Sequence, residues 1–173
     1  MQNPFTLTFG KSPLEPVERP LQTMEIVDTF TAETVNQQMF IITGVRGSGK
    51  TVMMTEIARR LREREDWVVI ELNPATDLLQ GMLAKLNSNK VCAAIIKSAK
   101  IDLSFFGFGV AIEGVPPLTD TETAIITILE KLKKQDKRLL ITIDEVTNND
   151  YMKVFAGSFQ IFVRQDLPVF LLA

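Results

Sequence analysis

The sequence contains no histidine, and it has a single cysteine, a single tryptophan and a single tyrosine in 173 residues. Without histidine there is no Ser-His or Cys-His nucleophilic site and no His-ligated metal site. Any chemistry therefore depends on carboxylates, lysine, hydroxyl groups and a bound ion. One cysteine excludes an internal disulfide, and because Cys92 lies in an apolar helical stretch we expect it to be a small buried core residue.

Strong charge of one sign and long apolar runs are also missing. Nineteen basic and 21 acidic residues give a net charge of −2, so no strongly basic field indicates nucleic acid or an anionic membrane surface. No run approaches the roughly 18 apolar residues of a membrane span, and the N-terminus lacks the features of a signal peptide. We expect a cytoplasmic protein without membrane association, long enough for one α/β domain with a real core.

The clearest motif is Gly-Val-Arg-Gly-Ser-Gly-Lys-Thr at residues 44–51, between an apolar run at 39–43 and a helical pattern. This is the form of a phosphate-binding loop. Glycines let backbone N–H groups curl around a phosphate, Lys50 supplies a cation for the β- and γ-phosphates, and Thr51 offers a hydroxyl to Mg²⁺. The positive end of the following helix adds to the same spot. The predicted nucleotide-binding residues are Gly44, Val45, Arg46, Gly47, Ser48, Gly49, Lys50 and Thr51.

A second motif is the apolar run at residues 139–143 that ends in Asp144 and Glu145. In a parallel sheet, ligands bind at the carboxyl ends of the strands, so both acids should arrive beside the phosphate loop. We predict that Asp144 holds Mg²⁺, directly or through water, and that Glu145 orients and deprotonates an attacking water, with Lys50 as the other catalytic residue. The alternative is a buried strand that simply ends in solvated charges. The phosphate loop in the same chain favours the functional interpretation.

Composition along the chain indicates how it is organised. Four of the eight prolines lie in residues 1–20, which predicts an extended N-terminal arm, and residues 21–173 should form the nucleotide-binding core. The alternation of strand and helix patterns predicts an α/β fold, a three-layer parallel sheet with helices on both faces. Strands are expected at 39–43, 67–72, 139–143 and 168–172. Helices are expected near 21–34, after the phosphate loop, within 76–99 with a break near 87–89, from a Thr119-x-x-Glu122 capping box onward, and after Glu145.

Three further features leave alternatives open. Residues 103–110 are strand-like, and the segment 105–112 is predicted to be a structural strand or hairpin, against an exposed partner-binding hairpin. Asn148 and Asn149 are predicted to cap the next helix, against a role in positioning water. Arg164 is interpreted as a solvated charge at a helix end, against an arginine finger that reaches a neighbouring subunit's nucleotide.

Together the two motifs resemble the Walker A and Walker B motifs of P-loop ATPases of the additional-strand, catalytic-glutamate division. The wording of residues 44–51 is similar to that of AAA+ and STAND-like ATPases, especially prokaryotic ATPases related to origin-recognition initiators. Residues 3–19 resemble their entry segment, which usually reads hydrophobic-Gly-Arg and borders the adenine. The resemblance implies Val17 and Arg19 as adenine-pocket residues, although Glu18 stands where glycine is common. The alternative for this segment is a simple surface turn.

The resemblance covers essentially the whole chain but only the nucleotide-binding subdomain of such proteins. It implies the sheet order 5-1-4-3-2, with strand 5 missing from this sequence and the phosphate-loop strand left at a sheet edge. The sensor residue, the helical lid and any C-terminal region would follow Ala173. We therefore expect this sequence to be part of a longer protein.

The resemblance implies ATP and Mg²⁺ as cofactors and an ATPase that acts as a nucleotide-driven conformational switch. DNA or a protein partner would bind through regions outside this chain, and a nucleotide-dependent homo-oligomer is expected. A second hypothesis is a nucleotide-binding module with negligible hydrolysis that assembles on DNA or a protein partner. A third, a small-molecule or nucleotide kinase, is disfavoured because no arginine-rich acceptor lid is visible. ATP is preferred to GTP because no Asn-Lys-x-Asp segment is seen.

Overall fold

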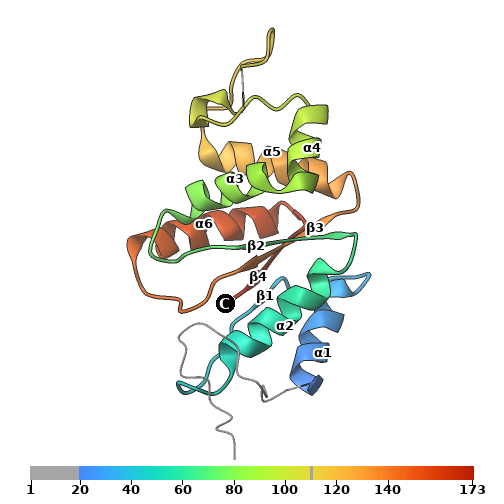
Figure 1. Ribbon diagram of the computed structural model, residues 1–173, viewed down its shortest axis with the longest axis vertical. Coiled ribbons are helices and arrows are strands. Elements are labelled where there is room, and N and C mark those ends of the chain that lie inside the picture. Colours follow the sequence, from blue (N-terminus) through green and yellow to red (C-terminus); the bar gives the residue numbers. More distant parts are fainter. Residues whose placement is uncertain (1–19, 110) are drawn as a thin grey trace, which may run out of the picture.

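The four apolar runs form one parallel sheet in the computed structural model, which describes residues 20–109 and 111–173 (Figure 1). The strands are β1 (Met39–Phe40), β2 (Trp67–Glu71), β3 (Arg138–Thr142) and β4 (Val169–Leu172). Every residue of β4 and the last four of β3 are buried, as expected of strands covered on both faces. The predicted α/β class with a parallel sheet is confirmed.

The strand order is β1-β4-β3-β2. These four strands follow one another as in the order 5-1-4-3-2, but the sheet differs from that full order because the described residues form no fifth strand. The strand β1 is therefore an edge strand. It is also shorter than the expected run at residues 39–43, although the Ile42 amide still donates to the Ala173 carbonyl at 2.6 Å.

Helices cover both faces of the sheet (Figure 1). On one face lie α1 (Pro20–Thr31) and α2 (Lys50–Arg62), and on the other lie α3 (Leu78–Ser88), α4 (Lys90–Ser98), α5 (Thr121–Lys133) and α6 (Asp150–Arg164). The predicted arm falls outside the described residues except Pro20, which opens α1 at a position where proline is favourable. Over the described part of the chain, no helix combines the length and apolar character needed to cross a bilayer.

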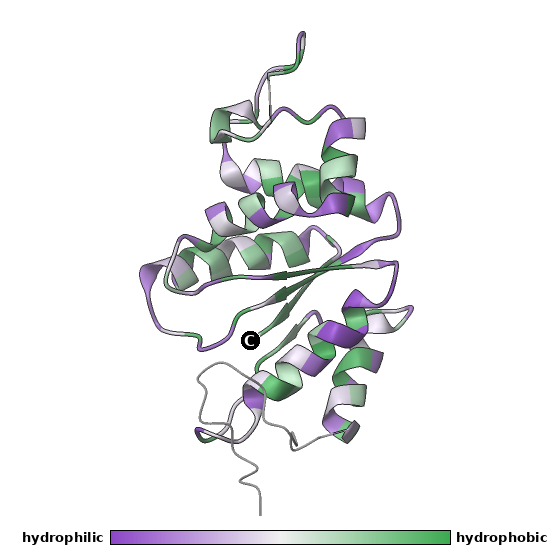
Figure 2. Cartoon of the chain, in the orientation of Figure 1, coloured by the Kyte–Doolittle hydropathy of each residue, from purple (hydrophilic) through white to green (hydrophobic). Residues whose placement is uncertain are grey.

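Strand side chains alternate between two apolar cores. Leu140 and Phe170 pack with α1 and α2, whereas Leu139, Ile141 and Leu171 pack with the helices of the other face. This alternation follows from the two-residue period of a strand. Figure 2 shows the result: hydrophobic strands lie in the middle and hydrophilic residues lie on the outer sides of the helices. The thiol of Cys92 is buried in the second core, which confirms that prediction.

Two helix boundaries depend on side-chain caps. Asn89 separates α3 from α4, near the predicted break, because its side chain accepts hydrogen bonds from the amides of Val91 and Cys92. The predicted capping box at Thr119 is wrong. Asp120 caps α5 instead, and its carboxylate accepts from the Thr123 amide at 2.7 Å. The side chain of Glu122 does not bond back to the cap because it accepts a hydrogen bond from Ser158 Oγ at 2.5 Å.

Residues 103–109 form a turn and not the predicted strand. A short 3₁₀ helix, η1 (Ser104–Phe106), leads into Gly107 with a left-handed φ of 77°. The buried Asp102 carboxylate accepts from the amides of Ser104 at 2.9 Å and Ile112 at 2.8 Å. The side chain of Ser104 most of all, followed by these two amides, holds the pKa of Asp102 below its ordinary value. The hydrogen bonds to this carboxylate hold the two ends of the segment together in a turn. Phe105 is 62% exposed, so binding of a partner here stays a prediction.

Arg138, at the start of β3, anchors α1 to the sheet. Its guanidinium donates to the carbonyls of Phe30 at 2.6 Å and Ala32 at 3.1 Å, and it lies 5.9 Å from the ring centroids of both Trp67 and Phe170. The partly buried side chain thus binds one carbonyl in the last turn of α1 and one just beyond its end, and it contacts two aromatic faces. It joins the outer helix layer to the centre of the sheet.

We expect Arg138→Met to lower the free energy of unfolding by about 1 to 3 kcal/mol, because two carbonyls lose a charged donor while the apolar stem is largely kept. Denaturant unfolding would be followed through the fluorescence of the sole tryptophan, Trp67, which lies against Arg138. Arg62→Met, at an exposed position of α2, is the control. Equal stability of the two variants would show that Arg138 does not anchor α1.

Candidate active site

The phosphate loop joins β1 to α2. Gly47 and Gly49 have left-handed φ values of 80° and 83°, a region that side chains other than glycine rarely adopt. Gly49 is also the N-cap of α2 and has no side chain to bond the first amides of that helix. These N–H groups and the positive end of α2 are therefore open to an anion. Val45 and Arg46 lie at the exposed tip of the loop, Val45 with 79% of its surface accessible.

Lys50 draws the loop together. Its ammonium group donates to the Gly44 carbonyl at 2.9 Å and to the Val45 carbonyl at 3.1 Å. The start of the loop is also tightly packed, because a Cβ atom added to Gly44 would lie 2.8 Å from Ser48 Oγ. The positive charge is thus held across the mouth of the loop, where phosphate oxygens would lie.

The two predicted motifs meet in one hydrogen bond. Thr51 Oγ1 donates to Asp144 Oδ2 at 2.8 Å, across 93 positions of sequence. The other oxygen of the same carboxylate accepts from the backbone amide of Glu145 at 2.9 Å. The first turn of α2 and the end of β3 are therefore linked at the edge where the strands terminate.

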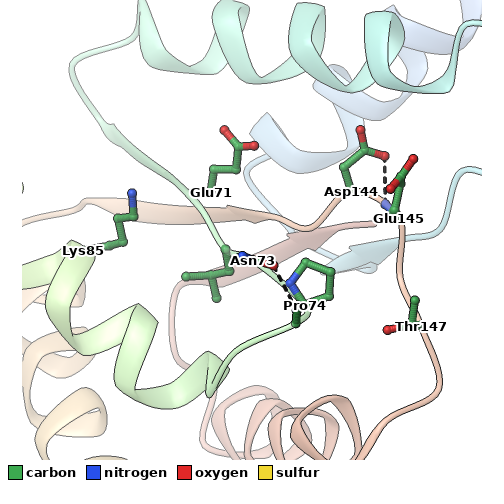
Figure 3. Close-up of a pocket in the computed structure, with 9 residues that line it drawn as sticks. Glu71, Asn73, Pro74, Lys85, Asp144, Glu145 and Thr147 are labelled. Atoms are coloured by element: carbon green, nitrogen blue, oxygen red, sulfur yellow. Dashed lines mark hydrogen bonds between the residues drawn. The ribbon is translucent and has the colours of Figure 1, made fainter. Parts of the chain in front are cut away.

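Glu145 has an unusual backbone. Its φ of 53° lies in the left-handed region, which costs a residue other than glycine about 1 to 3 kcal/mol and persists only where the surroundings impose it. The hydrogen bond from the Glu145 backbone amide to the Asp144 carboxylate is one such constraint. Figure 3 shows that the side chains of Asp144 and Glu145 rise on the same side of the strand end. Glu145 is exposed.

Asp144 and Glu145 line two hollows. One, of about 450 Å³, lies between the phosphate loop and the ends of β1, β3 and β4, and its walls include Ile41, Thr43, Gly44, Lys50, Met54 and Val146. The other, of about 590 Å³, lies between the ends of β2 and β3 and is lined also by Glu71, Asn73, Pro74, Lys85 and Thr147 (Figure 3). The two acids thus lie between the hollows, and phosphates bound in the first hollow would have Asp144 and Glu145 on the side that faces the second hollow.

The oxygen atoms of Thr51 and Asp144 fit Mg²⁺. A hydroxyl and a carboxylate 2.8 Å apart are hard oxygen donors of the kind this ion prefers. Mg²⁺ bound with a nucleotide typically needs only one or two protein ligands, because waters and phosphate oxygens supply the rest. Over the described residues, no group of three acidic, cysteine or histidine side chains is arranged to hold a metal without such help.

Other predicted residues lie elsewhere. Val17 and Arg19 fall outside the described residues. Arg164 is exposed at the end of α6, shortly before β4 begins and so toward the amino ends of the strands, whereas the phosphate loop lies at their carboxyl ends; a role as an arginine finger stays a prediction. Of the two asparagines predicted to cap the next helix, Asn149 caps α6, and its side chain accepts from the Met152 amide at 2.8 Å, whereas Asn148 precedes the cap.

The second hollow was not predicted from the sequence. Glu71 ends β2, and the rule that placed Asp144 at the carboxyl edge of the sheet applies to it equally. Lys85 and Thr147 carry no such signal, because a helix and a loop bring them there.

Comparison with known families agrees with this arrangement. A family model for ATPase domains found predominantly in Archaea matches residues 24–161, a stretch that contains the phosphate loop and both acids of the β3 end. No curated protein matches the chain. The match covers well over half of the sequence and the linked Thr51–Asp144 pair lies within it, so the chain belongs to this family of ATPase domains.

Proposed function

We propose that the chain is a Mg²⁺-dependent ATPase domain that converts ATP and water to ADP and phosphate. The observation that carries the proposal is the 2.8 Å hydrogen bond between Thr51 and Asp144. It brings a phosphate loop, a pair of oxygen ligands and the adjacent Glu145 to one place. A P-loop alone would support nucleotide binding, whereas the acid beside it supplies a base for water.

Each residue has a defined role in this proposal. The loop amides and Lys50 bind the β- and γ-phosphates and stabilise the charge that develops on them. Thr51 and Asp144 would hold Mg²⁺, which when bound neutralises phosphate charge and orients the leaving group. Glu145 orients a water molecule and accepts its proton as the water oxygen bonds to the γ-phosphorus and the bond to ADP breaks.

We further propose that hydrolysis or exchange of the nucleotide works as a conformational switch within a larger protein of the AAA+ or STAND-like kind. The similarity of residues 44–51 and 139–145 to those ATPases supports this role. Partners, DNA or protein, would contact other regions of such a protein, and nucleotide-dependent self-association is part of the proposal.

The second candidate is a nucleotide-binding module that hydrolyses ATP negligibly. The exposure of Glu145 favours it for this chain alone, because phosphoryl transfer is fastest where water other than the nucleophile is excluded. A covering surface from a partner or another copy would then be needed for turnover.

The role of Asp144 provides a direct test. Wild-type protein should bind ATP more tightly with Mg²⁺ than with EDTA, and Asp144→Asn should lose most of that gain, on the order of 10-fold, because a neutral amide is a weaker ligand. Titration calorimetry with ATP, with Mg²⁺ and with EDTA, measures this gain in affinity. Asp150→Asn is the control, since this side chain is 94% exposed and, among the residues that the structure describes, pairs only with Lys153. An equal Mg²⁺ effect in both variants would contradict the assignment.

A further inference from the structure

One side chain ties together the two loops that enclose the second hollow. The side-chain amide of Asn149 donates from Nδ2 to the Pro74 carbonyl at 2.8 Å, across 75 positions of sequence. Pro74 belongs to the connection from β2 to α3, and Asn149 ends the connection from β3 to α6 that carries Glu145. No other side-chain hydrogen bond between these two connections is found in the described residues.

The tie is rigid at the Asn149 end. Its Oδ1 accepts the amide of Met152 in the first turn of α6, and its Nδ2 also reaches Thr147 Oγ1 at 3.1 Å. The Asn149 amide donates in addition to the Thr147 carbonyl at 3.0 Å. The residue is partly buried, as are its bonds to Pro74 and Met152. Asn149 is therefore joined to α6 and to the Glu145 loop at once.

The acceptor end is equally constrained. Pro74 has a restricted φ, and it lies within a turn in which Asn73 Oδ1 accepts the amide of Ala75 at 2.9 Å. The next helix begins immediately afterwards with Asp77 as its N-cap. The Pro74 carbonyl is thus a fixed point on the β2 side of the hollow.

We propose that Asn149 is a positioning residue that holds the Glu145 loop against the β2 side of the site. Glu145 needs such support because its left-handed backbone is costly and its side chain is exposed. The loop is fixed at its beginning by Asp144 and at its end by Asn149. The inference rests on the proposed function, in which Glu145 acts on water.

The substitution Asn149→Asp separates this role from that of a simple helix cap. Aspartate caps a helix about as well as asparagine, so the bond from the Met152 amide is retained. Its carboxylate cannot donate to the Pro74 carbonyl and repels it. The matched control is Asn148→Asp, which makes the same change at an exposed neighbour.

Hydrogen exchange of the whole chain, followed by mass spectrometry, tests the tie without any activity. We expect residues 73–77 and 144–148 to exchange about 10-fold faster in Asn149→Asp than in Asn148→Asp, with α6 unchanged, because opening of both loops becomes easier. Unchanged exchange in both loops, or faster exchange confined to α6, would overturn the proposal.

Turnover of ATP tests the consequence for Glu145. We expect kcat of Asn149→Asp to fall about 10-fold relative to Asn148→Asp, with KM for ATP and Tm matching the control, because misplacement of the base affects chemistry and not binding. Equal kcat values would overturn the positioning role. Absence of turnover in the wild-type protein would instead count against the proposed hydrolysis, and the exchange result would then decide the tie alone.

Discussion

Glu145→Gln is expected to lower Mg²⁺-dependent ATP turnover by about 10²- to 10⁴-fold, the usual contribution of a general base, while ATP affinity stays near that of the wild type. Glutamine keeps the size of the side chain but cannot accept a proton. Binding should persist because the only hydrogen bond of Glu145 in the described structure is made by its backbone amide, to Asp144. Phosphate release and calorimetric titration with ATP measure the two effects separately.

Glu33→Gln makes the same chemical change at an exposed position before β1, away from the site, and should leave both quantities unchanged. Loss of turnover with retained binding in Glu145→Gln alone would establish Glu145 as the base. Tight binding with equally negligible turnover in the wild type and both variants would favour the nucleotide-binding module, which needs a covering partner before Glu145 can act.

Lys50→Ala is expected to weaken ATP binding by about 100-fold, equivalent to about 3 kcal/mol of charge-assisted hydrogen bonds. Two effects combine. The phosphates lose a cation, and the carbonyls of Gly44 and Val45 lose the ammonium group that draws the loop together. Competition between ATP and a fluorescent ATP analogue measures the affinity.

Inorganic tripolyphosphate should lose affinity in parallel with ATP, because Lys50 acts on phosphates and not on the base. Lys97→Ala removes an exposed lysine from α4 and serves as the control. Unchanged tripolyphosphate binding in Lys50→Ala would place the phosphates somewhere other than the 44–51 loop.

Local chemistry explains why the phosphate loop and the strands were predictable. The backbone of Gly47 and Gly49 requires left-handed angles that glycine adopts easily, and the continuous apolar runs at β3 and β4 are typical of strands covered on both faces. In such cases the structural requirement, a left-handed backbone or burial on both faces, is met by the type of residue at that same position. The same is true of the helix break near Asn89 and of Asn149 as a helix cap.

Two predictions of local structure were wrong because a polar side chain forms a hydrogen bond with a residue outside the local pattern. Residues 103–109 alternate like a strand, yet the Asp102 carboxylate binds the Ile112 amide and closes a turn. Glu122 has the spacing of a capping box, but it accepts the hydroxyl of Ser158 on α6. A local sequence pattern cannot predict such hydrogen bonds, because the tertiary structure decides which partners lie near each polar group.

The same limit applies to the site. The sequence alone predicted which residues could bind phosphate, metal and water, since these predictions follow from side-chain chemistry and from the carboxyl edge of a parallel sheet. The contact of Thr51 with Asp144, the second hollow beside Glu145 and the tie from Asn149 to Pro74 came from the packing of the chain. Each of these features joins segments that are far apart in sequence. The distance in space between such segments depends on how the helices pack on the sheet, which no single segment determines.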